Sequence, residues 1–174
     1  YNPDGSLDAS FGDNGKVTTD FGYAFGSSVA VDKANKIVVA GRNWVQFSAS
    51  EFAVARYNSD GSLDTTFDDD GKVTTTFGGA NAFGSSVAID RNGKIVVAGS
   101  RDYDDVFSVF AVARYNPDGS LDTSFSVDGK ATTQFANGRD EGHSVAIDSN
   151  NKIVVAGSST ESGSSVFAIA RYNP

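Results

Sequence analysis

Tyr1-Asn2-Pro3-Asp4-Gly5-Ser6-Leu7-Asp8 opens the chain, and the same pattern returns unchanged at residues 115–122. It also returns at residues 57–64, where a serine replaces the proline, and residues 172–174 begin it once more. Similarity at a fixed spacing is the signature of a repeat protein, in which each copy is one supersecondary unit. The chain of 174 residues therefore holds three repeats of about 57 residues each.

Four strands are expected in each repeat. Residues 36–41, 94–99 and 152–157 share the sequence Lys-Ile-Val-Val-Ala-Gly, and residues 52–57, 110–115 and 167–172 share an apolar segment that ends in Arg-Tyr. A segment of small residues precedes the first of these strands, and a segment like residues 72–77 follows the second. Gly, Asn and Asp separate the segments, as is typical of β-turns.

The burial expected for these strands favours a β-propeller. The two middle strands are apolar on both faces, as in a sheet packed between two other layers. The first strand is built of small residues and the last alternates like an exposed edge, which together match the radial gradient of a propeller blade. We therefore predict an all-β fold of β-propeller blades in a single repeat domain over residues 1–174, with blades at about 27–77, 85–135 and 144–173. A β-trefoil, which also has three four-stranded repeats, is the alternative.

Composition and charge restrict the class of protein. The net charge is −8 at pH 7, and cysteine is absent. An acidic surface repels nucleic-acid phosphate, and a chain without cysteine has neither disulfides nor thiolate metal sites. No apolar run approaches the roughly 20 residues of a membrane-spanning helix. We expect no nucleic-acid partner, no membrane span and no cofactor, and we interpret the start at Tyr1 as that of a processed or excised piece.

The repeated motifs resemble a known family. Asn-Pro-Asp-Gly-Ser-Leu-Asp, Gly-Lys-Val-Thr-Thr, Lys-Ile-Val-Val-Ala-Gly and Phe-Ala-Val-Ala-Arg-Tyr-Asn together are similar to the bacterial delta-60 repeat, over essentially the whole chain. This resemblance implies propeller-like blades in large exported bacterial proteins, and hence an extracellular or cell-surface location. It carries no known catalytic residues, so none is transferred to this chain.

The loops that differ most between the repeats are candidates for a binding surface. In a propeller these loops lie on one face, whereas the turns of the opposite face are nearly identical in the three copies. Variation on one face of a rigid scaffold is typical of ligand binding, and aromatic side chains beside carboxylates suit a glycan or a protein partner. The candidate ligand-binding residues are Trp44, Phe47, Tyr103, Asp104, Asp105, Arg139 and His143.

His143 offers a catalytic alternative. It is the sole histidine and lies close to Asp140 and Glu141 in the sequence, so it could act as a general base in a hydrolase. No Gly-x-Ser-x-Gly nucleophile elbow accompanies it. We therefore expect a protein that is not an enzyme, with a purely structural spacer as a further alternative.

Two groups of acidic residues are weak calcium candidates. Asp68, Asp69 and Asp70 are adjacent, and the oxygens of the repeated turn are spaced as hard cations prefer. An arginine, however, occupies the position before this turn where calcium loops of the integrin type need a further carboxylate. We favour turns that Asx hydrogen bonds and glycine stabilise, and no metal site.

The arrangement of the repeats predicts self-association. The third blade has three strands, and the strand of the missing type lies in residues 15–21 at the other end of the chain. We expect residues 1–21 of another chain of the same type to complete this blade, because unpaired strand edges invite pairing. A head-to-tail homodimer with six blades is the predicted assembly, and a longer, filament-like array is the alternative.

Overall fold

The computed structural model describes residues 1–103 and 107–174 and contains strands but no helix in that part of the chain. Eleven strands are found among these residues: β1 (Ala24–Val31), β2 (Ile37–Asn43), β3 (Glu51–Tyr57), β4 (Lys72–Thr75), β5 (Asn81–Ile89), β6 (Ile95–Asp102), β7 (Ser108–Tyr115), β8 (Lys130–Thr133), β9 (Arg139–Ile147), β10 (Ile153–Glu161) and β11 (Ser164–Tyr172). The sequence thus correctly predicts an all-β fold.

The strands form antiparallel meanders in chain order. Strands β1 to β4 make one four-stranded sheet. Strands β5 to β8 and strands β9 to β11 form two further meanders, which a single parallel pair, Ser108 with Arg139, joins into a seven-stranded sheet. We name these meanders unit 1 (β1–β4), unit 2 (β5–β8) and unit 3 (β9–β11).

An irregularity in the first strand of each unit lets neighbouring units approach closely. The register between β5 and β6 shifts between Gly84 and Ser86, and similar shifts occur in units 1 and 3. At this bulge a side chain on Gly99 would lie 1.9 Å from the Phe83 carbonyl oxygen, so glycine is required there. Ser86, just after the bulge, accepts a hydrogen bond from the Val145 amide of unit 3 (3.2 Å). The small residues of this strand therefore serve contacts between units as well as pairing within one.

The units stack face to face. One apolar cluster joins Val38, Phe52 and Val54 of unit 1 to residues of β6 and β7, and a second joins unit 2 to unit 3. Strand β7 is buried along its whole length and β6 over most of its length, as the prediction of two-sided burial requires. In unit 1, β3 is buried over most of its length and β2 only in part, whereas β11 of unit 3 is exposed along most of its length.

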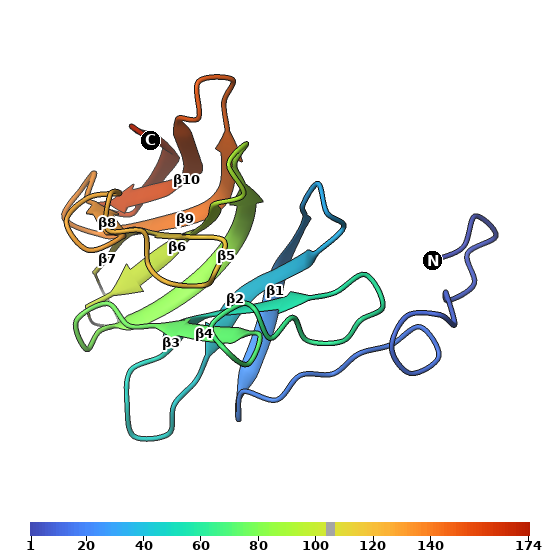
Figure 1. The fold of residues 1–174 in the computed structure, drawn as a ribbon. Coiled ribbons are helices and arrows are strands. Elements are labelled where there is room, and N and C mark those ends of the chain that lie inside the picture. The colour runs from blue at the N-terminus through green and yellow to red at the C-terminus, as the bar shows by residue number, and fades with distance from the viewer. Residues whose placement is uncertain (104–106) are drawn as a thin grey trace.

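The stack is open. Figure 1 shows the N-terminus and the C-terminus on opposite sides of the molecule, with the sheets arrayed between them. Residues 15–21, for which the sequence predicts a strand, contain no strand, and their nearest regular feature is an isolated bridge between Gly12 and Lys16. The physical reason is that no described strand lies beside them to supply the ladder of hydrogen bonds.

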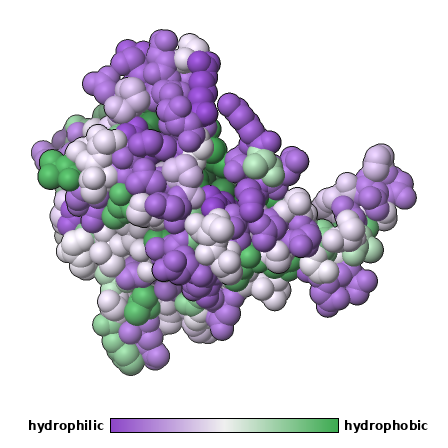
Figure 2. Space-filling view, viewed as in Figure 1, coloured by the Kyte–Doolittle hydropathy of each residue, from purple (hydrophilic) through white to green (hydrophobic). Residues whose placement is uncertain are grey.

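The surface is largely hydrophilic in the view of Figure 2, with small hydrophobic spots, one of them at the β2–β3 loop at the bottom of the picture. In residues 1–103 and 107–174, no helix exists that could cross a lipid bilayer.

Candidate functional site

A buried ion network lies under the repeated turn. The Asp64 carboxylate accepts hydrogen bonds from Arg56 Nε (2.8 Å) and from Thr66, and it lies 3.0 Å from Lys36 Nζ. Burial alone would raise the pKa of Asp64, but the hydrogen bonds from Thr66 and Lys36 and the charge of Arg56 outweigh it and hold the pKa at about 2. The Arg56 guanidinium also stacks over the ring of Phe67, 4.9 Å from its centroid.

The network recurs in unit 2 around Asp122, with Arg114 Nε at 2.6 Å and Lys94 Nζ at 2.5 Å. Arginine and lysine side chains thus balance the charge of the last aspartate of this turn in both units.

Asp68, Asp69 and Asp70 do not gather around a common point. Asp70 accepts a hydrogen bond from the Lys72 amide and lies 3.5 Å from Lys72 Nζ. Burial and the neighbouring carboxylates raise the pKa of Asp68. In the described part of the chain, no cluster of three metal-ligating side chains occurs, so nothing in the geometry strengthens the calcium interpretation.

An aromatic groove lies where units 1 and 2 meet. The rings of Tyr23 and Trp44 pack edge to face, 5.5 Å apart, because Tyr23 accepts the Trp44 amide hydrogen bond (2.7 Å) and holds the two loops together. The Arg42 guanidinium lies between two rings, 4.7 Å from Phe25 and 5.2 Å from Phe83. We call this the aromatic groove; its volume is about 410 Å³, and Ser50 and Asn81 complete the lining.

Of the predicted binding residues that the structure describes, only Trp44 lines this groove. Phe47 is 98% exposed at the tip of its loop, outside the lining. Tyr103 stacks under Arg101, 4.3 Å from the guanidinium, and against Phe107. Asp104 and Asp105 lie outside the described residues.

Arg139 and His143 belong to a different place, on β9 of unit 3. Arg139 lies 3.7 Å from Glu141 and 3.9 Å from Asp102, and it is thus already engaged by carboxylates. His143 Nε2 lies 3.3 Å from Ser158 Oγ. Asp140, close to His143 in the sequence, is buried and accepts hydrogen bonds from the backbone of Phe135 and Ala136 instead.

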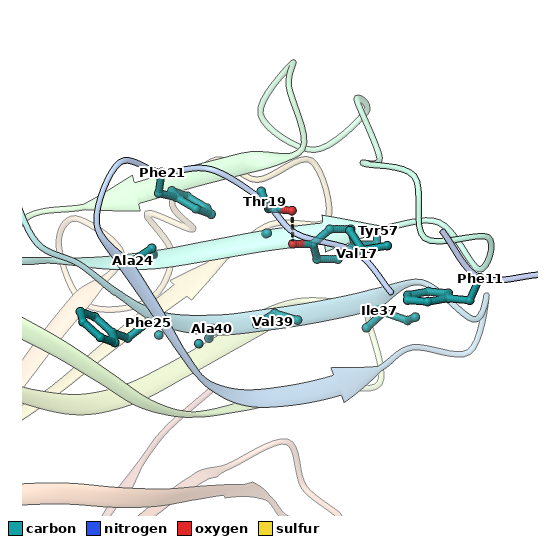
Figure 3. A pocket seen from close by; sticks show the side chains of 14 residues that line it. Phe11, Val17, Thr19, Phe21, Ala24, Phe25, Ile37, Val39, Ala40 and Tyr57 are labelled. Atoms are coloured by element: carbon teal, nitrogen blue, oxygen red, sulfur yellow. Dashed lines mark hydrogen bonds between the residues drawn. The ribbon is translucent and has the colours of Figure 1, made fainter. Parts of the chain in front are cut away.

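A second, apolar groove lies at the N-terminal end of the stack. Its volume is about 350 Å³, and Figure 3 shows residues 11–21 running along the outer face of unit 1. We call this the N-terminal groove; its lining includes Phe11, Val17, Ile37, Val39, Ala53 and Ala55. Tyr57 donates a hydrogen bond to Thr19 (2.6 Å) at its side.

Known families were compared with the chain. A family described as a domain of unknown function (DUF5122) beta-propeller matches residues 35–67, 91–125 and 149–174, more than half of the chain. The chain belongs to this β-propeller family. No curated protein matches it. The propeller prediction is thus confirmed at the level of fold type, in preference to the β-trefoil.

In this β-propeller chain, Tyr23, Phe25, Arg42 and Phe83 line the aromatic groove but were not among the binding residues predicted from the sequence. A signal for Arg42 was present, because the other two repeats have Ser100 and Ser158 at its position. Its flanking by two rings was not predictable, since Phe83 comes from the next unit.

Proposed function

We propose that this β-propeller chain is a non-catalytic scaffold that binds a glycan through the aromatic groove. The observation that carries the proposal is the exposed Tyr23–Trp44 pair beside Arg42, in a concave place on the variable loops. Aromatic rings offer an apolar face with little conformational entropy to lose, which suits the C–H face of a sugar ring. A groove of this volume lies in the range of small-ligand sites.

Arg42 adds a directional group to the groove. Among residues 1–103 and 107–174, its guanidinium makes ring contacts but no hydrogen bond or ion pair. A guanidinium presents five N–H donors in a planar fork, and sugar hydroxyls or a sugar carboxylate would accept them. The net charge of −8 disfavours highly anionic polymers, so we propose a neutral or weakly acidic glycan.

Export to the bacterial surface is part of the same proposal. It is supported by the resemblance of the repeats to delta-60 repeats of exported proteins, and by a chain without cysteine, which needs no particular redox environment.

A glycan array probed with the labelled chain tests the proposal. Binding to a defined glycan is expected, and Trp44→Ala should weaken it at least tenfold, since it removes the larger stacking surface. Tyr103→Ala is the matched control, because it removes an exposed aromatic residue of another loop and should leave affinity unchanged. Equal loss in both variants, or binding to no glycan, would contradict the proposal and favour a structural spacer.

A hydrolase centred on His143 is the second candidate, because the contact between His143 Nε2 and Ser158 Oγ joins a base to a nucleophile. Within the described residues, no carboxylate hydrogen-bonds to the imidazole to orient it, as a triad would require. Hydrolysis of an ester, glycoside or phosphate substrate that disappears in both His143→Ala and Ser158→Ala would establish this alternative over the scaffold.

A further inference from the structure

Two apolar residues of the last strand are exposed, although the residues at the equivalent positions of the other two repeats are buried. Phe52 and Phe110 are fully buried, whereas Phe167, the matching residue of β11, is 96% exposed. Val54 and Val112 are fully buried as well, whereas the matching Ile169 is 65% exposed. A large apolar side chain left in water forgoes the free energy that its burial would contribute.

The two buried examples show what covers these positions. Phe52 and Val54 of unit 1 pack in one cluster with Ile95, Val97 and Ala111 of unit 2. The matching residues of unit 1 on that same side are Ile37, Val39 and Ala53. Those residues line the N-terminal groove, and Figure 3 shows Ile37 and Val39 beside the N-terminal segment. The exposed face of β11 and the N-terminal groove are therefore the two halves of one unit-to-unit contact.

We propose that the N-terminal groove binds β11 of a second copy of this chain, with Phe167 and Ile169 filling it. The second copy is the fitting occupant, because each contact needed between the two faces already occurs twice inside the chain.

The N-terminal segment already lies where the last strand of a preceding unit would lie. Thr19 accepts its hydrogen bond from Tyr57 (2.6 Å) just as Thr75 does from Tyr115 (2.7 Å). Likewise the Gly12 amide donates to the Asp60 carbonyl (2.7 Å), as the Asp68 amide does to Asp118 (2.7 Å). Residues 12–19 therefore already lie in position to receive β11.

We call the contact between the N-terminal groove of one copy and β11 of another the joint. Its register follows from the two strand pairs already present. Phe52 pairs with Thr75 and Val54 with Val73 in unit 1, and the corresponding pairs recur between β7 and β8. By the same alignment, Phe167 would pair with Thr19 of the second copy, and Ile169 with Val17. This pairing would supply the ladder whose absence leaves residues 15–21 without strand structure.

An ion network that is split between the chain ends gives the joint its specificity. Asp8 matches Asp64 and Asp122 in the repeat, yet its carboxylate bonds only to Ser10 within the described residues. Its expected cations, Arg171 and Lys152, lie at the far end, where Lys152 Nζ already contacts Asn173 (2.8 Å) as Lys36 Nζ contacts Asn58 (2.5 Å). In the joint, Arg171 and Lys152 would enclose Asp8 of the second copy.

One overlap sets a condition on the joint. Tyr172-Asn173-Pro174 has the same sequence as Tyr1-Asn2-Pro3, so both tripeptides would compete for one place. Tyr1 is 91% exposed, whereas Asn2 hydrogen-bonds to Ser6 and to the Leu7 carbonyl. The joint therefore requires residues 1–3 to leave their turn and Asn173 to take the place of Asn2.

A charge exchange tests the joint in solution. Light scattering should give the wild-type chain a mass of at least two copies of 18.2 kDa. Asp8→Arg and Arg171→Asp should each yield monomers, since like charges then meet in the joint. An equimolar mixture of the two variants should assemble again, because both of its joints regain an opposite pair. Asp13→Arg is the matched control: it is exposed, lies in the same segment, and occupies a position where the third repeat has Val127.

Cross-linking tests the register. The chain has no cysteine, so Val17→Cys combined with Ile169→Cys should form disulfides between copies on oxidation. Val17→Cys combined with Ala168→Cys should not, since Ala168 points to the opposite face of β11. The proposal would be overturned if the wild-type chain stays monomeric at 100 times the concentration used for routine sizing. It would also be overturned if the mixture of variants stays monomeric, or if the cross-links form within one chain.

Discussion

At the scale of the residue, Asp64 and Asp122 each draw an arginine and a lysine from different strands onto one carboxylate. Such a pair contributes little beyond its own desolvation cost, but removing one partner leaves an uncompensated buried charge. These ion pairs therefore stabilise the turn at the end of each repeat motif.

Asp122→Asn should destabilise the protein by about 3 kcal/mol, because it leaves the buried Arg114 unpaired. The urea unfolding midpoint measures this loss. Asp118→Asn, in the same turn, removes an exposed carboxylate that, within residues 1–103 and 107–174, bonds only to the neighbouring Ser120. The midpoint of this variant should stay close to that of the wild type. Equal shifts for both variants would show that the buried network is not what stabilises the turn.

Acid should weaken the fold. Since the pKa of Asp64 is about 2 in the folded protein and 3.8 ordinarily, its stabilisation is complete above about pH 4 and is lost as the pH falls toward 2. The pKa of Asp122 is lowered in the same direction, where hydrogen bonds from Lys94 and Ser124 outweigh the effect of burial. The urea midpoint should therefore be similar at pH 6 and pH 4 and lower at pH 2.5, and the double variant Asp64→Asn, Asp122→Asn should show a smaller decrease. A midpoint that rises on acidification would contradict this assignment.

At the scale of the element, the two middle strands of each repeat were predictable because their apolar residues occupy both faces, and their neighbours in the sheet are close in sequence. Residues 15–21 were wrongly predicted to form a strand. Lys16-Val17-Thr18-Thr19 has the same sequence as β4, but β4 pairs with β3, and residues 15–21 have no such strand beside them. Strand formation here depends on a neighbour, and composition alone does not report whether one is present.

Phe110→Ala and Phe167→Ala form a matched pair at this scale. Phe110→Ala should cost about 3–5 kcal/mol, because it opens a cavity between units 2 and 3. Phe167→Ala should leave the stability of a dilute, monomeric chain almost unchanged, since that side chain contacts water. Chemical denaturation at low protein concentration compares them, and a large loss in Phe167→Ala would indicate packing of β11 that the fold does not contain.

At the scale of the molecule, the open stack exposes an apolar face at each end. The propeller type was predictable from the repeats, but the aromatic groove was only partly so. Trp44 was visible as the sole tryptophan in a variable loop, whereas Phe25, Arg42 and Phe83 converge across two units. Convergence between units depends on stacking geometry, which the sequence of one repeat does not contain.

Joining of copies should make stability depend on concentration. Because association adds its free energy to that of the folded state, the melting temperature should rise as the chain concentration increases. Differential scanning calorimetry over a hundredfold dilution series measures this rise, and Arg171→Asp should abolish it. A melting temperature that is independent of concentration in the wild type would argue against association of the folded chains.

Burial between units sets the acid–base chemistry of two tyrosines. Burial raises the pKa of Tyr115 well above its usual value, despite its hydrogen bond to Thr75, and it raises that of Tyr172 as well. Such a phenol ionises more readily in the unfolded chain than in the folded one. Its protonated form therefore stabilises the fold below about pH 10, and this stabilisation is lost as the pH rises further. An alkaline spectrophotometric titration tests this. The phenolate absorbance of Tyr115 should appear only as units 1 and 2 separate, so that ultraviolet absorption records the opening of that one interface.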